Sequence, residues 1–219
     1  MSILSSLNPW ALFCLAFGAM LLGSWLMGRQ GRQMITMDPV RRQVSIMALE
    51  FPSDRLEIAN IMQGFFKLPE EEKRASIRSL KSQLVTDFLL FMPGAYGGIC
   101  LMCLQVAEKM ASAGYYVFTA LAAAQGVCFL LDSIENIYFW SKIRPDAQPA
   151  TPGGFRMLQA LEIGKWGLAL LGAMCGFSAV AYFWLAGQYS ASSLIYVAIF
   201  FGEILVFLLL AGRKKPQNA

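Results

Sequence analysis

The sequence predicts an all-α membrane protein, a bundle of five transmembrane helices with its N-terminus outside and its C-terminus in the cytoplasm. Three observations predict it. Of the 219 residues, 57% are hydrophobic and 15% are charged, with a mean hydropathy of +0.52, a balance that does not suit a soluble core. Five long apolar windows divide the chain. Basic and aromatic residues gather at the ends of these windows.

The five windows define the predicted spans, because a helix needs about 20 largely apolar residues to cross a bilayer. The first window has no Lys or Arg before it and is long for the apolar part of a signal peptide, so we expect it to be retained. The whole chain is then a single membrane domain. The predicted spans are residues 9–28, 85–107, 115–140, 157–186 and 194–212.

The distribution of basic residues predicts the orientation, since Lys and Arg concentrate in cytoplasmic loops. Five spans place all but Lys109 and Lys165 of the 18 Lys and Arg residues at the cytoplasmic face. Four or six spans would move 213–215, which is Arg-Lys-Lys, to the outside. The charge asymmetry therefore favours five.

The polar segment 29–83 is predicted to be a cytoplasmic helical appendage rather than an independent domain, because it is too short to bury a large core of its own. Ser53 and Asp54 supply helix-capping side chains before an amphipathic stretch, whose apolar face we expect to dock under the bundle. Pro69 followed by three glutamates indicates a second helix that continues into the second span.

Ionisable residues inside the predicted spans are the candidate functional residues, because each needs a partner, water or a neutral state in lipid. Asp132, Glu135 and Asn136 follow the i, i+3, i+4 spacing of one helical face. Lys165 is the natural counter-ion. Asp87, Glu162 and Lys165 lie on the first turns of their spans, so the sequence leaves open whether they are buried or interfacial. The predicted cluster comprises Asp87, Asp132, Glu135, Asn136, Glu162 and Lys165.

The acids of this cluster outnumber its single cation, and buried carboxylates without compensation are costly. Protonation, a bound cation, water, or Arg41 and Arg42 folding back under the bundle would each offset them. Glu203 is an isolated acid within the fifth span, with no partner in its own helix. We expect it to be hydrogen-bonded rather than ionised.

Several chemistries are excluded because the chain contains no histidine. A Ser-His-Asp triad, histidine-ligated zinc, a Glu-x-x-His di-iron site and bis-histidine haem are therefore absent, and phosphate-binding glycine loops are absent too. No catalytic, cofactor-binding or metal residue is predicted, and no cofactor. The five cysteines lie in spans, where packing is the expected role. Magnesium held by Asp132, Glu135 and Glu162 stays open as an alternative.

Short motifs give one resemblance. The chain carries ALEF at Ala48–Phe51, TDF at Thr86–Phe88, LLDSIEN at Leu130–Asn136 and a lysine, Lys165, in the next span. In this order the motifs, over about residues 47–171, resemble a family of small bacterial integral membrane proteins with no assigned activity. The resemblance implies a bacterial cytoplasmic (inner) membrane protein in which the polar residues act as one unit.

Three functions are open from the sequence. The first is a non-enzymatic accessory or assembly subunit of a larger membrane complex, favoured by the small size and the lack of a soluble catalytic domain. The second is a transporter or channel for protons, cations or a small basic solute that uses the acidic cluster. The third is a lipid-modifying enzyme with a carboxylate-bound metal. The expected partners are membrane lipids and other membrane subunits or a second copy, and not nucleic acid.

Overall fold

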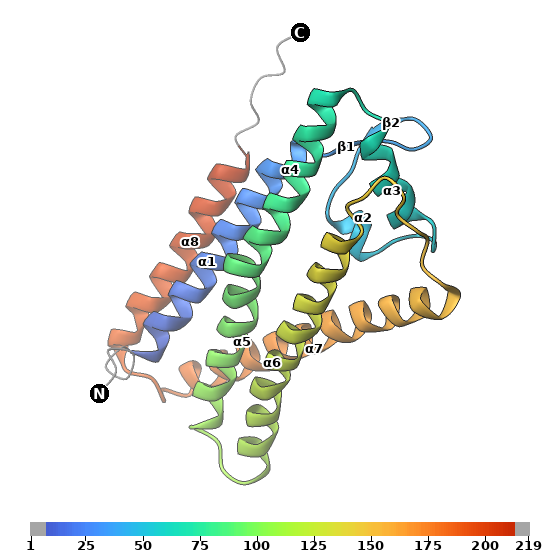
Figure 1. The fold of residues 1–219 in the computed structure, drawn as a ribbon. Coiled ribbons are helices and arrows are strands. Elements are labelled where there is room, and N and C mark those ends of the chain that lie inside the picture. The colour runs from blue at the N-terminus through green and yellow to red at the C-terminus, as the bar shows by residue number, and fades with distance from the viewer. Residues whose placement is uncertain (1–7, 213–219) are drawn as a thin grey trace, which may run out of the picture. The chain divides into compact units, whose positions relative to one another are not determined.

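The computed structural model describes residues 8–212, and Figure 1 follows the chain through them. Helices dominate, with one short hairpin. The helices are α1 (Pro9–Gln30), α2 (Met47–Glu50), α3 (Glu57–Phe66), α4 (Glu70–Thr86), α5 (Met92–Ala107), α6 (Ala113–Ser141), α7 (Pro152–Leu185) and α8 (Leu194–Gly212). Between them lie η2 (Gly31–Gln33), β1 (Ile35–Met37), β2 (Arg41–Gln43), the π turn η3 (Asp87–Phe91) and η4 (Ala191–Ser193).

Five helical stretches among the described residues are long and apolar enough to cross a membrane, which confirms the predicted number. The second stretch starts 15 residues before the predicted window, at Glu70 rather than at residue 85. Helix α4 is polar over much of its length, so a window based on hydropathy does not detect it. The five stretches are Pro9–Gln33, Glu70–Ala107, Ala113–Ser141, Pro152–Leu185 and Ala191–Gly212.

The chain forms two compact units, each made of segments that are distant in the sequence. Unit 1 comprises residues 1–25, 90–129 and 168–219. Unit 2 comprises residues 26–89 and 130–167. The polar segment 29–83 thus shares its unit with parts of α6 and α7.

Unit 2 has a core built on α3, as its amphipathic sequence predicts. Ile61, Met62 and Phe65 are fully buried on one face of this helix. Phe139 of α6 and Ala147 of the following loop belong to the same apolar cluster. The apolar face of the segment is therefore covered by protein from α6 and its loop, within one unit.

The hairpin β1–β2 is an element that the sequence analysis did not predict. Its antiparallel register pairs Ile35 with Gln43 and Met37 with Arg41. The Thr36 hydroxyl donates to the carbonyl of Ile61 in α3 (2.9 Å). Gly64 lies so close to Thr36 that any side chain there would collide with it. Three-residue strands carry too little periodicity to be found from sequence.

The second membrane-crossing stretch changes its helical geometry before Pro93. Proline has no N–H to donate, and its ring crowds the carbonyl four residues earlier. Residues Asp87–Phe91 form a π turn directly before α5, which begins at Met92. A wider turn relieves this crowding without ending the helix.

Unit 1 is packed through glycines that allow helices to approach closely. A Cβ atom on Gly94 of α5 would lie 2.5 Å from the backbone nitrogen of Met20 and 2.6 Å from the carbonyl oxygen of Ala16, both in α1. A Cβ atom on Gly172 of α7 would lie 2.7 Å from Nε2 of Gln125. Gly94 and Gly172 are also the first glycines of two GxxxG spacings, Gly94/Gly98 and Gly172/Gly176, and here they serve packing within the chain.

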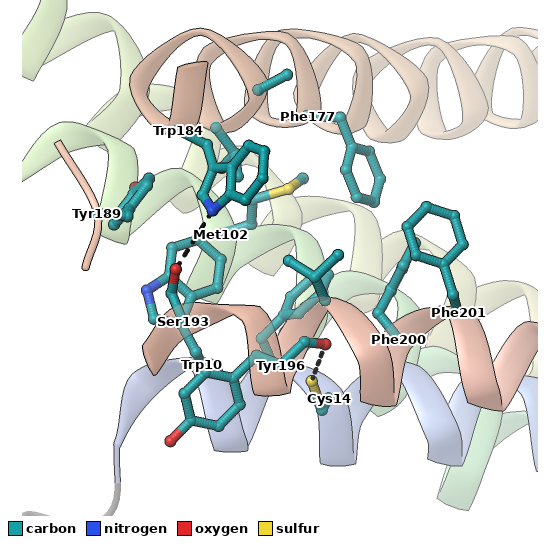
Figure 2. Close-up of a pocket in the computed structure, with 14 residues that line it drawn as sticks. Trp10, Cys14, Met102, Phe177, Trp184, Tyr189, Ser193, Tyr196, Phe200 and Phe201 are labelled. Atoms are coloured by element: carbon teal, nitrogen blue, oxygen red, sulfur yellow. Dashed lines mark hydrogen bonds between the residues drawn. The ribbon is translucent and has the colours of Figure 1, made fainter. Parts of the chain in front are cut away.

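Unit 1 also contains a cavity of about 260 Å³. Aromatic side chains from α1, α7 and α8 surround it, as Figure 2 shows for Trp10, Phe177 and Phe200. Nε1 of Trp184 donates to the hydroxyl of Ser193 at its edge (3.3 Å). The walls are almost entirely apolar.

Candidate functional site

All six residues of the predicted cluster lie in unit 2. Helix α6 contributes Asp132, Glu135 and Asn136, α7 contributes Glu162 and Lys165, and the π turn η3 contributes Asp87. The five ionisable side chains are buried, with Glu162 and Lys165 only 1% and 2% exposed. The sequence left open whether Asp87, Glu162 and Lys165 are buried, and the structure shows that other side chains of unit 2 enclose all three.

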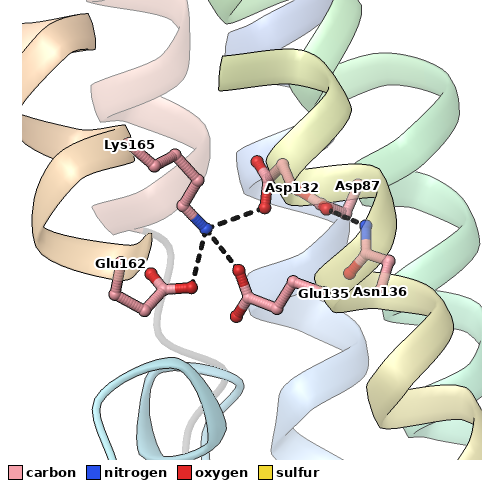
Figure 3. A network of polar contacts seen from close by, with 6 residues as sticks. All are labelled: Asp87, Asp132, Glu135, Asn136, Glu162 and Lys165. Atoms are coloured by element: carbon pink, nitrogen blue, oxygen red, sulfur yellow. Dashed lines mark hydrogen bonds and ion pairs between the residues drawn. The ribbon is translucent and has the colours of Figure 1, made fainter. Parts of the chain in front are cut away.

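The ammonium group of Lys165 is the centre of the cluster. It donates to Asp132 Oδ1 (2.8 Å), Glu135 Oε2 (2.5 Å) and Glu162 Oε1 (3.0 Å). Figure 3 shows the lysine reaching from α7 toward α6, with Glu162 one helical turn before it. A lysine ammonium carries three N–H donors, and here each has a carboxylate acceptor. Such charge-assisted bonds are among the strongest that side chains make.

A second polar contact ties η3 to α6. The side-chain amide of Asn136 donates to Asp87 Oδ2 at 2.6 Å. Asp87 is 7% exposed. The π turn presents this carboxylate at the start of a rearranged helix, where a sequence-based helical wheel does not apply. Asn136 therefore bonds to Asp87, while Lys165 pairs with the other three acids of the cluster.

Two carboxylate oxygens of the cluster have no hydrogen-bond partner. Glu135 Oε1 and Glu162 Oε2 are both buried and unpaired in the described structure. Each belongs to a glutamate whose other oxygen accepts from Lys165. Three carboxylates share one ammonium, so acceptors outnumber donors in the cluster. The two unpaired oxygens are the acceptors that lack a donor.

Glu50 is a further acid of this unit that the sequence analysis missed. It ends α2, outside the membrane-crossing helices, and its Oε2 is buried without a hydrogen-bond partner. Burial raises the pKa of this carboxyl to about 8, with smaller increases from Glu162, Asp132 and Asp87 and an opposing effect of Lys165. In the sequence, Glu50 stands in a polar segment and gives no sign of burial.

The arginines near the N-terminus do not compensate the cluster. Arg41 pairs with Glu72 (3.1 Å), and Arg42 lies near Glu57 (3.6 Å). Both arginines are exposed, so the suggestion that they fold back toward the buried acids is wrong. Glu57 of α3 and Glu72 of α4 lie close to the hairpin, and they are the acids that these two arginines contact.

Two further polar residues, Gln125 and the predicted intramembrane acid Glu203, lie in unit 1. Gln125 is buried and donates to the backbone carbonyls of Leu121 (3.2 Å) and Leu168 (3.5 Å). Glu203 of α8 packs against Gly18, where a Cβ atom would lie 2.7 Å from Oε1. Its Oε2 is buried without a hydrogen-bond partner in the described structure, so the expected hydrogen bond is not confirmed.

Over residues 8–212, no group of three or more His, Cys, Asp or Glu side chains is arranged to hold a metal ion. The three acids that were considered as magnesium ligands, Asp132, Glu135 and Glu162, instead contact the ammonium of Lys165. Comparisons with protein-family models, with curated proteins and with solved structures find no match. The family resemblance of the short motifs therefore stays a prediction.

Proposed function

We propose that the protein is a non-enzymatic integral membrane protein that serves as an accessory or structural subunit of a larger membrane complex. The observation that carries this proposal is the saturation of Lys165. All three of its donors go to carboxylates of the same chain, and two of these bonds join α7 to α6. An ammonium group of the kind that catalysis or transport would use is here bound by carboxylates, and this contact holds helices together.

The surface of unit 1 agrees with this proposal. No residue of α8 is fully buried, and large apolar side chains such as Leu194, Phe201 and Leu209 are exposed along it. Helix association in lipid depends on close packing and polar contacts between helices. The exposed helix is available to lipid and to a neighbouring subunit.

The test is affinity purification of the full chain from native membranes in a mild detergent. We expect a second membrane protein to co-purify in constant stoichiometry, and the ratio to survive size-exclusion chromatography. Quantitative mass spectrometry of the purified fraction measures it. Recovery of the chain alone, as a monomer or a self-oligomer from several detergents, would contradict the accessory role.

Movement of protons or cations is the second candidate function, and the acidic excess favours it. Two buried carboxylate oxygens, Glu135 Oε1 and Glu162 Oε2, are free to accept a proton or a cation. Flux into proteoliposomes containing wild-type protein, Asp132→Asn or Glu135→Gln tests this function. Flux that both changes abolish, in protein that stays folded, would favour transport over the accessory role.

We further propose a bacterial cytoplasmic membrane and an orientation with the N-terminus outside. The asymmetry of Lys and Arg supports this orientation. Cysteine tags at Ser2 and Ser190 should react with an impermeant reagent from outside, and tags at Pro149 and Asn218 only from inside. Labelling of Asn218 from outside would contradict five spans.

A further inference from the structure

A cavity of about 360 Å³ lies beside the Lys165 cluster, within unit 2. It is lined by the last turns of α6, the first turns of α7 and the loop that joins them. Glu135, Glu162 and Lys165 all line it, so the cavity reaches the charged centre of the unit. The transport function considered above assigns protons, cations or a small basic solute to the acidic cluster, but it names neither this cavity nor the chemical group that would bind there.

The unpaired oxygens of the cluster belong to residues that line this cavity. Glu135 and Glu162 are 7% and 1% exposed, and each keeps one buried oxygen without a hydrogen-bond partner. Figure 3 shows that each glutamate turns one oxygen to Lys165 and leaves the other pointing away from it. Buried acceptors of this kind are costly unless a donor reaches them. Both glutamates line the cavity, so the space lies next to their carboxylate groups.

The charge at this end of the cavity selects the sign of the ligand. Three carboxylates surround one ammonium, so a cation gains more here than an anion or a neutral molecule. Because two carboxylate oxygens lack a hydrogen-bond donor, a ligand group with at least two N–H donors suits the site. A primary ammonium carries three, whereas a quaternary ammonium carries none.

The remaining walls select the body of the ligand. Leu131, Met157, Leu158 and Leu161 give the cavity an apolar side, which suits an alkyl chain next to the ammonium. Tyr138 adds an aromatic face. A bare metal ion has no apolar part that would contact these walls, so it suits the cavity less well than an alkylammonium does.

Lys142 directly follows α6 and lines the same cavity, seven residues after Glu135 and about 10 Å farther along the helix axis. Its ammonium donates to the carbonyl of Gln148 (3.0 Å) and lies 5.2 Å from the ring centroid of Tyr138. The cavity is thus acidic at one end and basic at the other. An ammonium ligand that also carries a phosphate would meet both charges.

We propose that this cavity binds a primary ammonium group on an apolar body, with Glu135 Oε1 and Glu162 Oε2 as its acceptors. The ammonium can belong to a free alkylamine or to the headgroup of an ethanolamine phospholipid, since the chemistry at the two glutamates is the same. This inference does not rest on either proposed function, because it requires only the cluster and the cavity. A subunit can carry such a ligand as a bound lipid, and a transporter can carry it as its solute.

The first test uses the full chain in a neutral detergent, with n-butylammonium as the probe and tetramethylammonium as a probe of equal charge without N–H donors. Isothermal titration calorimetry should show saturable binding of n-butylammonium. The affinity for tetramethylammonium should be weaker by a factor of about ten or more. Equal affinity for the two ions, or no saturable binding of either amine or ethanolamine lipid, would overturn the proposal.

Three variants locate the binding. Glu135→Gln and Glu162→Gln each remove one acceptor charge and should lower the affinity about tenfold, whereas Glu203→Gln, a matched acid in unit 1, should keep the wild-type value. Met157→Trp narrows the cavity from an exposed position and should weaken binding while leaving every carboxylate in place. Circular dichroism and size-exclusion profiles monitor folding. Unchanged affinity in both glutamate variants would overturn the assignment.

The second test distinguishes the two sources of the ammonium. Native mass spectrometry from nanodiscs should show retention of phosphatidylethanolamine over phosphatidylcholine, which differ in the N–H donors of the headgroup. If the lipid is the ligand, it should compete with n-butylammonium. Lys142→Gln should then lower the affinity for the lipid and leave the affinity for n-butylammonium unchanged. If the lipid neither competes nor is retained, while n-butylammonium binds, the ligand is a free amine.

Discussion

The two units of this protein are held together by different means. Unit 2 buries five charged side chains, and three of them, Asp132, Glu135 and Glu162, surround the ammonium group of Lys165. In unit 1, no charged side chain of the described residues is fully buried, and its helices meet at glycines and aromatic rings. The core of unit 1 therefore contains no buried charge among the described residues, while unit 2 combines an apolar cluster with an ionic one.

The difference shows two solutions to one problem. Lipid tails are as apolar as leucine, so helices in a bilayer gain little from the hydrophobic effect when they associate. Glycines such as Gly94 let backbones approach and gain van der Waals contact. A buried lysine with three acceptors gains strong directional bonds, but each partner then depends on the others.

The largest expected effect is the loss of the central cation of unit 2. Lys165→Met leaves three buried carboxylates without their shared donor, so the free energy of unfolding should fall by about 3–5 kcal/mol. Thermal unfolding of the detergent-solubilised protein measures it. Lys109→Met in unit 1 is the control, because Lys109 is exposed and its removal should cost about 1 kcal/mol or less.

A double variant sharpens this first prediction. Adding Asp132→Asn to Lys165→Met removes one of the stranded charges and should recover part of the stability. Strictly additive losses would mean that the two residues do not interact, and would contradict the ionic description of unit 2.

The second effect tests the packing of unit 1. Gly94→Ala introduces a methyl group against backbone atoms of Met20 and Ala16, which cannot move aside as a side chain would, so we expect a loss of about 1–3 kcal/mol. Gly97→Ala is the matched control in the same helix, because its Cβ meets nothing within 4 Å. The difference between the two melting temperatures is the measurement. If Gly97→Ala proves the more harmful, the α1–α5 contact is not close packed.

The third effect concerns the pH dependence of unit 2. The pKa of Glu50 lies near 8 in the folded protein and near 4.5 as its ordinary value, so folding takes up a proton between these values. Stability should therefore fall as the pH rises from about 4.5 to 8 and then level off. Glu50→Gln removes this titration and should gain on the order of 1–2 kcal/mol over wild type at pH 8, but little at pH 4.5.

Melting temperatures over this pH range, with Glu71→Gln as the control for the loss of an exposed negative charge, measure the effect. A gain of Glu50→Gln that is the same at pH 4.5 and pH 8 would show that the carboxyl of Glu50 does not titrate with folding.

The smallest effect compares an exposed ion pair with the buried cluster of the same unit. Arg41 and Glu72 are 56% and 32% exposed and lie 3.1 Å apart. Water and salt screen such a pair, so Arg41→Gln should change the free energy of unfolding by about 0.2–1 kcal/mol. A loss comparable to that of Lys165→Met would mean that the hairpin, and not the cluster, sets the stability of unit 2.

The sequence by itself determined the number of apolar helices, because length and hydropathy act locally along the chain. It also singled out Asp87, Asp132, Glu135, Glu162 and Lys165, since a charge within an apolar window stands out without any knowledge of the fold. The start of α4 at Glu70 could be anticipated from Pro69 and the glutamates that follow it.

Only the tertiary structure decided how these residues are satisfied. Glu162 is a local i,i+3 neighbour of Lys165, but whether Lys165 also meets Asp132 and Glu135 depends on how α6 and α7 face each other, which no local pattern records. The burial of Glu50 Oε2, the pairing of Arg41 with Glu72 and the cavity beside Glu162 likewise depend on segments distant in the sequence. A side chain's chemistry is local, whereas its partners are set by how helices from separate parts of the chain pack.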